Sequence, residues 1–238
     1  MKNNRLKTVA TLLVLFMVFG AFAQNKNTIT LSLDSFYTKI KGQKNPQIID
    51  ARSPEEFALN HIEGALNFNL QTTDYDTYIL KLDKSKPVFL YAINTGRSTA
   101  LAQELIKRAF SEAYDLEGGI ANWIGGGKPF YTNLKSKLSL ENYNKIISDT
   151  DTVLVDIGSQ YCGACRKVKP ILETIRTQYG DHLKIIEIDL EESPQVIADL
   201  KTVQVFPTLI LYKKGKVIFK KDGFTNLKKD VDLALIQK

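Results

Sequence analysis

The sequence predicts an α/β protein of two domains, and three observations lead to this expectation. Short β-rich runs alternate with helical patterns along the chain, which is typical of sheets covered by helices. Two apolar blocks, 28–131 and 138–238, are separated by the short polar segment 132–137, which we expect to be a linker. The composition, 44% hydrophobic and 24% charged, is that of a globular protein rather than a disordered one.

The first block has two apolar runs, 47–50 and 87–91, that read as buried strands of a mainly parallel sheet. Ser53 precedes an apolar helical pattern and is followed three residues later by Glu56, which predicts a capping box. A longer amphipathic helix is expected over 98–110. The first block therefore predicts a domain with helices on both faces of its sheet.

The second block repeats this alternation. Strand patterns cover 153–158, 183–190, 206–212 and 217–219, and a helical pattern covers 166–179. Lysines cluster around the turn at Lys214-Gly215, where a solvated hairpin explains them better than a nucleic-acid surface does. We therefore expect no nucleic-acid partner.

The first 23 residues resemble a secretory signal. Three basic residues (Lys2, Arg5 and Lys7) precede an apolar run of 15 residues that ends in Ala21-Phe22-Ala23, so cleavage is expected before Gln24. An uncleaved anchor is the alternative, although about 20 residues are needed to cross a bilayer. Cleavage would lower the formal charge from +6 to +3. We expect a soluble, periplasmic or secreted protein with no membrane span after cleavage.

Cys162 and Cys165 are the only cysteines in the chain. Their Cys-x-x-Cys spacing, between an expected strand and an expected helix, lets two sulfurs open and close as a disulfide. A helix N-terminus favours the thiolate of Cys162, because free N–H groups and the helix dipole lower its pKa.

A structural disulfide remains an alternative, but so short a loop stabilises the fold little. A zinc site needs about four ligands, and only His61 and His182 would supplement the cysteines. We expect no metal and no cofactor beyond this redox-active disulfide.

Several motifs in the second block occur in the order seen in the thioredoxin family. They are Val153-Leu154-Val155-Asp156, Tyr161-Cys162-Gly163-Ala164-Cys165-Arg166, Ile186-Glu187-Ile188-Asp189 and Val203-Gln204-Val205-Phe206-Pro207-Thr208. From Leu138 onward the chain therefore resembles a thioredoxin domain, which implies a mixed central sheet and thiol–disulfide exchange.

The resemblance implies a role for each matching residue. Cys162 is the nucleophile, and Cys165 is the more buried resolving thiol. Asp156 accepts the proton of Cys165 through water, unless it is a satisfied structural carboxylate. The Phe206–Pro207 peptide is cis and presents backbone to an extended substrate, unless Pro207 is an ordinary trans proline at an edge strand. The implied substrate-binding residues are Tyr161, Gly163, Ala164, Phe206 and Pro207.

Two departures from the family pattern leave the direction of electron flow open. Tyr161 replaces the usual tryptophan, and Ala164 is neither the proline typical of reductants nor the histidine typical of oxidants. The expected partners are proteins that carry thiols or disulfides, together with an upstream redox donor or acceptor. An adaptor that tethers clients without turnover is the alternative function.

The first block carries motifs of another family. They are Ile48-Ile49-Asp50-Ala51-Arg52-Ser53-Pro54-Glu55-Glu56-Phe57, Asn60-His61-Ile62-Glu63-Gly64-Ala65-Leu66-Asn67 and Leu116-Glu117-Gly118-Gly119-Ile120-Ala121-Asn122-Trp123. They resemble a rhodanese domain, which implies a three-layer α/β fold. Rhodaneses carry sulfur on a loop cysteine, but Ala92 stands at that position here, ahead of Arg97-Ser98. The resemblance therefore implies a catalytically inactive domain that serves as scaffold, docking surface or vestigial anion pocket.

Overall fold

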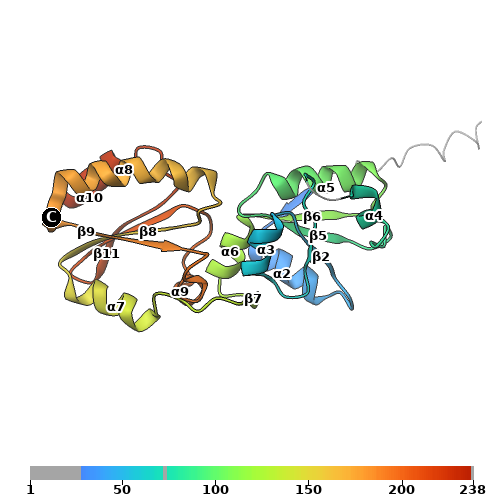
Figure 1. The fold of residues 1–238 in the computed structure, drawn as a ribbon, viewed down its shortest axis with the longest axis horizontal. Coiled ribbons are helices and arrows are strands. Elements are labelled where there is room, and N and C mark those ends of the chain that lie inside the picture. Colours follow the sequence, from blue (N-terminus) through green and yellow to red (C-terminus); the bar gives the residue numbers. More distant parts are fainter. Residues whose placement is uncertain (1–27, 72–73, 237–238) are drawn as a thin grey trace, which may run out of the picture.

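The chain forms two α/β domains in a computed structural model that describes residues 28–71 and 74–236 (Figure 1). The predicted fold class is confirmed. The expected signal segment and the expected cleavage site before Gln24 lie outside the described residues. Within the described ranges, no helix is long and apolar enough to cross a membrane.

The N-terminal domain is built on a five-stranded sheet of order β1-β6-β5-β2-β4, in which all neighbouring strands are parallel. A separate antiparallel pair joins β3 and β7. The strands are β1 (Ile29–Leu31), β2 (Gln47–Asp50), β3 (Asn60–Ile62), β4 (Leu66–Asn67), β5 (Val88–Tyr91), β6 (Ala113–Leu116) and β7 (Phe130–Thr132). The helices are α2 (Leu33–Lys41), α3 (Pro54–Leu59), α4 (Tyr75–Ile79), α5 (Arg97–Lys107) and α6 (Gly119–Gly125).

Alternation along the central strands produces the three layers of this domain. Ile48 and Phe89 pack with residues of α2 and α6 on one face of the sheet. Their chain neighbours Ile49 and Leu90 pack with residues of α4 and α5 on the other. Because successive strand side chains point to opposite faces, a sheet buried on both sides needs such continuous apolar runs.

The local signals in this domain define its helix starts well. The predicted capping box is present, because the Ser53 side chain accepts from the Glu56 N–H while the Glu56 carboxylate accepts from the Ser53 N–H. Helix α5 begins one residue earlier than predicted and ends at Lys107 instead of Phe110. The chain leaves the helix before Phe110 because Ala109 adopts a left-handed conformation, with φ of 69°.

The C-terminal domain has a mixed sheet of order β11-β10-β8-β9, in which β8 and β9 are parallel and β10 is antiparallel to both of its neighbours. Leu154 and Leu209 pack beneath α8 and α10, whereas Val155 and Ile210 face α7 and α9. The strands are β8 (Thr152–Gly158), β9 (Lys184–Asp189), β10 (Thr208–Lys213) and β11 (Lys216–Asp222). The helices are α7 (Leu140–Asp149), α8 (Gly163–Tyr179), α9 (Pro194–Leu200) and α10 (Leu227–Ile236), with a 3₁₀ turn at Gly180–His182.

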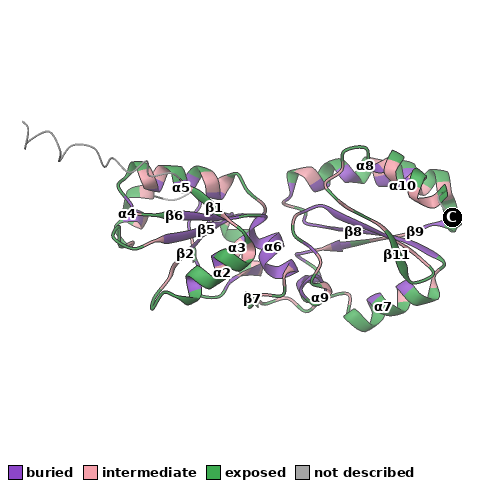
Figure 2. Cartoon of the chain, turned by 180° about the vertical axis from the view of Figure 1, so that it is seen from behind, coloured by how far each residue is buried: buried purple, intermediate pink, exposed green. Residues whose placement is uncertain are grey.

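Helix α6 of the N-terminal domain packs at the junction of the two domains, against α9, and all of its residues are buried (Figure 2). A Cβ on Gly125 would lie 2.2 Å from the Val203 carbonyl oxygen, and one on Gly118 would lie 2.1 Å from that of Gln204. The backbones of the two domains therefore touch where only glycine fits. One apolar cluster continues across this junction, from Ile120 and Ile124 of the first domain into the second.

We predict that Gly125→Ala opens the junction between the domains. The new methyl group would overlap backbone, which does not move as a flexible side chain does, so stability should fall by about 1–3 kcal/mol. Guanidinium unfolding would measure this loss, and small-angle scattering should show a larger radius of gyration. Gly42→Ala is the matched control, because its nearest neighbour would lie at an ordinary 3.5 Å. An unchanged radius and midpoint for Gly125→Ala would contradict the packing described.

Candidate active site

The two cysteines lie where β8 passes into α8. Their sulfurs are bonded as a disulfide, and their Cα atoms are 5.2 Å apart. Cys162 is the N-cap residue of α8, and the backbone N–H of Cys165 donates to its Sγ over 3.2 Å. The sulfur thus occupies the position of an N-cap acceptor. The sequence-based expectation of a dithiol at a helix start is confirmed.

This placement favours negative charge on Cys162. The first N–H groups of a helix lack partners within the helix, and aligned peptide dipoles add partial positive charge there. Helix α8 has 17 residues, so it is long enough for this field to develop. When the disulfide is reduced, this position at the helix N-terminus favours the thiolate form of Cys162.

The loop before β10 faces the disulfide. Its Phe206–Pro207 peptide is cis, as the resemblance implies, and the Phe206 carbonyl oxygen lies 3.7 Å from Cys162 Sγ. The Thr208 hydroxyl donates either to the Val205 carbonyl or to the Asp222 carboxylate, and both oxygens lie within 2.8 Å. The cis-proline loop, defined as residues 203–207, therefore lies against Cys162 Sγ.

Asp156 is a buried carboxyl on β8, with 8% of its surface exposed. It points to the same face of the strand as Gly158, where an added Cβ would lie 3.1 Å from Cys165 Sγ. Its Oδ1 atom has no hydrogen-bond partner among the described residues. Burial, reinforced by Glu187 and Asp189, raises the pKa of Asp156 to about 7. The group therefore exchanges its proton near neutral pH, on the side of the sheet where Cys165 lies.

The residues around the cysteines differ in exposure. Gly163 is exposed, and Tyr161 and Ala164 are half-buried, so this rim of the site is open to solvent. Burial raises the pKa of Tyr161, as do the negative charges of Glu191, Glu56 and Glu55. Because Glu55 and Glu56 belong to α3, the N-terminal domain contributes to the electrostatics of this rim.

The expected burial order of the two cysteines is wrong. Cys162 is 1% exposed and Cys165 is 7% exposed. Cys162 Sγ lies 3.7 Å from the Phe206 carbonyl oxygen of the cis-proline loop, and Asn94 of the N-terminal domain binds the backbone of Phe206. A sequence match to the thioredoxin domain alone cannot predict the contacts that the N-terminal domain makes near Cys162.

The loop expected to carry a sulfurtransferase cysteine reaches the same junction. Ala92 is fully buried, and its carbonyl oxygen accepts from the Ile120 N–H of α6. Arg97 donates through both Nη atoms to the Glu56 carboxylate, at 2.6 and 2.8 Å, and Ser98 is buried in the first turn of α5. The guanidinium is thus already paired with a carboxylate of its own domain.

Asn94 and the two contact glycines were not predicted as site residues. Asn94 lies within the loop 92–98 and is 112 residues from its partner Phe206. No local pattern indicates such a contact. The described residues also contain no cluster of three or more His, Cys, Asp or Glu side chains arranged to hold a metal ion.

Comparison with known proteins agrees with both resemblances. Residues 135–234 match the thioredoxin family, and residues 32–125 match the rhodanese-like domain. The chain is 33% identical over 78 residues to a thioredoxin of Acidithiobacillus ferridurans, which covers 33% of this chain and 71% of that protein. It is 34% identical over 128 residues to the uncharacterized protein YqhL of Bacillus subtilis, which covers 54% of this chain and 96% of that one. Oxidised mitochondrial thioredoxin 3 of Saccharomyces cerevisiae aligns with a TM-score of 0.37 and 26% identity, over 42% of this chain and 93% of that one.

The chain belongs to the thioredoxin family through its C-terminal domain, which follows a rhodanese-like domain. The order of the two domains is as predicted. The thioredoxin domain supports a thiol–disulfide oxidoreductase activity.

We predict that Asp156→Asn stabilises the oxidised protein at alkaline pH. The pKa of the Asp156 carboxyl is about 7 in the folded state and 3.8 in the unfolded state. Its contribution to the stability of the fold is therefore fully present below about pH 4. That contribution is lost as the pH rises through 7. A shift of about three units corresponds to at most about 4 kcal/mol. Urea unfolding should show the variant to be more stable than the wild type at pH 8, with little difference at pH 4.

The exposed Asp181 provides the matched control, because Asp181→Asn removes a carboxyl that is not buried and should not reproduce the gain in stability at pH 8. Equal profiles for the wild type and Asp156→Asn would show that the Asp156 carboxyl titrates normally.

Proposed function

We propose that the protein is an exported thiol–disulfide oxidoreductase that exchanges disulfides with protein substrates through Cys162 and Cys165. The observation that carries this proposal is the position of Cys162 Sγ, which accepts from the Cys165 N–H at the start of α8 and faces the cis-proline loop. A structural disulfide requires neither a helix N-terminus nor a facing backbone edge.

In the reducing direction, the Cys162 thiolate attacks a substrate disulfide. A bond forms between Cys162 Sγ and one substrate sulfur, and the other substrate sulfur leaves as a thiolate. Cys165 then attacks Cys162 Sγ, which restores the intramolecular disulfide and releases the second substrate thiolate. Two electrons pass from the protein dithiol to the substrate, and the reverse sequence oxidises a substrate dithiol.

Asp156 is proposed to take the proton from Cys165 before the second attack. A base works best when its pKa lies near the working pH, and the pKa of Asp156 is raised to about 7. The shared orientation of Asp156 and Gly158 toward the α8 face supports transfer through an intervening water. No cofactor beyond the disulfide is needed for these steps.

The proposed setting outside the cytoplasm rests on the composition of residues 1–23. In an oxidising compartment the dithiol stays reduced only when another dithiol protein supplies electrons, and it acts as an oxidant when an acceptor keeps it oxidised. The proposal therefore includes one upstream redox partner of this class. Clients are proteins with accessible thiols or disulfides.

The rhodanese-like domain is proposed to act as a scaffold or docking module without sulfur transfer. Ala92 offers no sulfur for a persulfide, and the two cysteines of the chain, Cys162 and Cys165, both lie outside the loop 92–98. The bidentate pair of Arg97 with the buried Glu56 argues against an anion site, because an added anion would have to displace a carboxylate. The packing of the rhodanese-like domain on the cis-proline loop favours the scaffold role.

We predict that Cys162→Ser abolishes dithiothreitol-driven insulin reduction, whereas Cys165→Ser accumulates mixed disulfides with the substrate. Both variants lack the disulfide, so they form a matched pair that differs only in which sulfur remains. Turbidity would follow insulin reduction, and mass spectrometry would detect the trapped adducts.

Turnover that survives in Cys162→Ser would contradict the assignment of the nucleophile. A wild-type protein that binds clients covalently, yet shows no multiple turnover with excess dithiothreitol, would identify the client-tethering adaptor instead.

A further inference from the structure

The N-terminal domain makes a two-point contact with the backbone of Phe206. The Asn94 Nδ2 atom donates to the Phe206 carbonyl oxygen over 2.9 Å, and the Phe206 N–H donates to Asn94 Oδ1 over 3.1 Å. Both polar backbone groups of the residue before Pro207 are therefore bound by one side chain of the other domain.

This contact has the chemistry of a β-bridge. In an antiparallel pair, two opposed residues exchange both N–H···O bonds, and an extended peptide that adds to a sheet edge binds in the same way. The carboxamide of asparagine has one carbonyl oxygen and an N–H donor, as a peptide group does. Asn94 thus uses the hydrogen-bonding groups of Phe206 that an incoming segment would need.

The occupied edge is next to the reactive sulfur. The carbonyl oxygen that accepts from Asn94 also lies 3.7 Å from Cys162 Sγ. A substrate segment that brings its disulfide to Cys162 by pairing with Phe206 therefore meets Asn94 at the same atoms. A small disulfide needs no such pairing.

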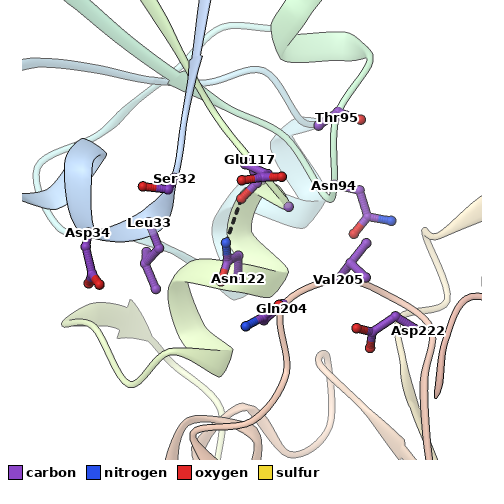
Figure 3. A pocket seen from close by; sticks show the side chains of 11 residues that line it. Ser32, Leu33, Asp34, Asn94, Thr95, Glu117, Asn122, Gln204, Val205 and Asp222 are labelled. Atoms are coloured by element: carbon purple, nitrogen blue, oxygen red, sulfur yellow. Dashed lines mark hydrogen bonds between the residues drawn. The ribbon is translucent and has the colours of Figure 1, made fainter. Parts of the chain in front are cut away.

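Asn94 lies at the rim of the domain junction. It is half-buried, and it lines a cavity of about 550 Å³ together with Thr95, Gln204 and Val205 (Figure 3). Figure 3 shows its side chain above the segment that carries Gln204 and Val205. Since open space borders the contact, the asparagine can leave Phe206 without disturbing the apolar packing of α6.

We propose that Asn94 is a specificity-determining residue that competes with extended protein segments for the backbone of Phe206. It disfavours protein disulfides that bind through an extended strand and leaves small disulfides unaffected. The proposal rests on the thiol–disulfide exchange proposed for Cys162. Only segments that bind the cis-proline loop strongly enough to displace Asn94 reach Cys162.

The test uses the full chain and compares kcat/KM for insulin with kcat/KM for hydroxyethyl disulfide. Asn94→Ala removes both hydrogen bonds, so we expect about a tenfold gain with insulin and less than about a twofold change with hydroxyethyl disulfide. Asn94→Asp keeps the acceptor but loses the donor to the Phe206 carbonyl, and it should shift activity the same way. Asn45→Ala, at an exposed asparagine of the same domain, is the control and should change neither value.

Hydrogen exchange at the Phe206 amide provides a readout that is independent of turnover. Exchange should be faster in Asn94→Ala than in Asn45→Ala. Unchanged or reduced insulin turnover in Asn94→Ala would overturn the proposal, as would equal gains with both disulfides. A wild-type chain that reduces neither substrate would instead refute the proposed function, and the inference with it.

Discussion

The arrangement of this protein depends on the close approach of α6 to the cis-proline loop. Gly118 and Gly125 bring the backbone of the first domain against Gln204 and Val203, at distances that leave no room for a side chain. This contact places the loop 92–98 of the rhodanese-like domain beside the dithiol. A rhodanese-like domain with Ala92 at the position expected for a loop cysteine is thereby packed on the cis-proline loop of the other domain.

Much of the fold could be predicted because it follows from local and periodic signals. The apolar runs of β2 and β5, the capping box at Ser53 and the helix start at Cys162 each depend on neighbouring residues. The domain junction could not be predicted, because Asn94 and Phe206 are 112 residues apart and glycine contacts leave no periodic pattern. For the same reason the expected burial order of the cysteines was wrong.

Two opposing electrostatic influences act on the dithiol. The start of α8 favours the Cys162 thiolate, which stabilises the reduced state and makes a disulfide more oxidising. Asp156 and Glu191, when ionised, disfavour the Cys162 thiolate because they carry the same sign of charge. Burial is the main cause that raises the pKa of both carboxyls, and the neighbouring Asp189 adds to it, so each becomes negatively charged only at a higher pH than an exposed carboxyl does.

The central claim is that Cys162 and Cys165 form a redox site rather than a structural bridge. The most direct measurement is the reduction potential of the pair in the full chain, equilibrated in redox buffers and read by alkylation and mass spectrometry. A redox site should give a single reversible two-electron transition between about −270 and −120 mV. A pair that stays oxidised to below about −300 mV, as structural disulfides do, would contradict the account.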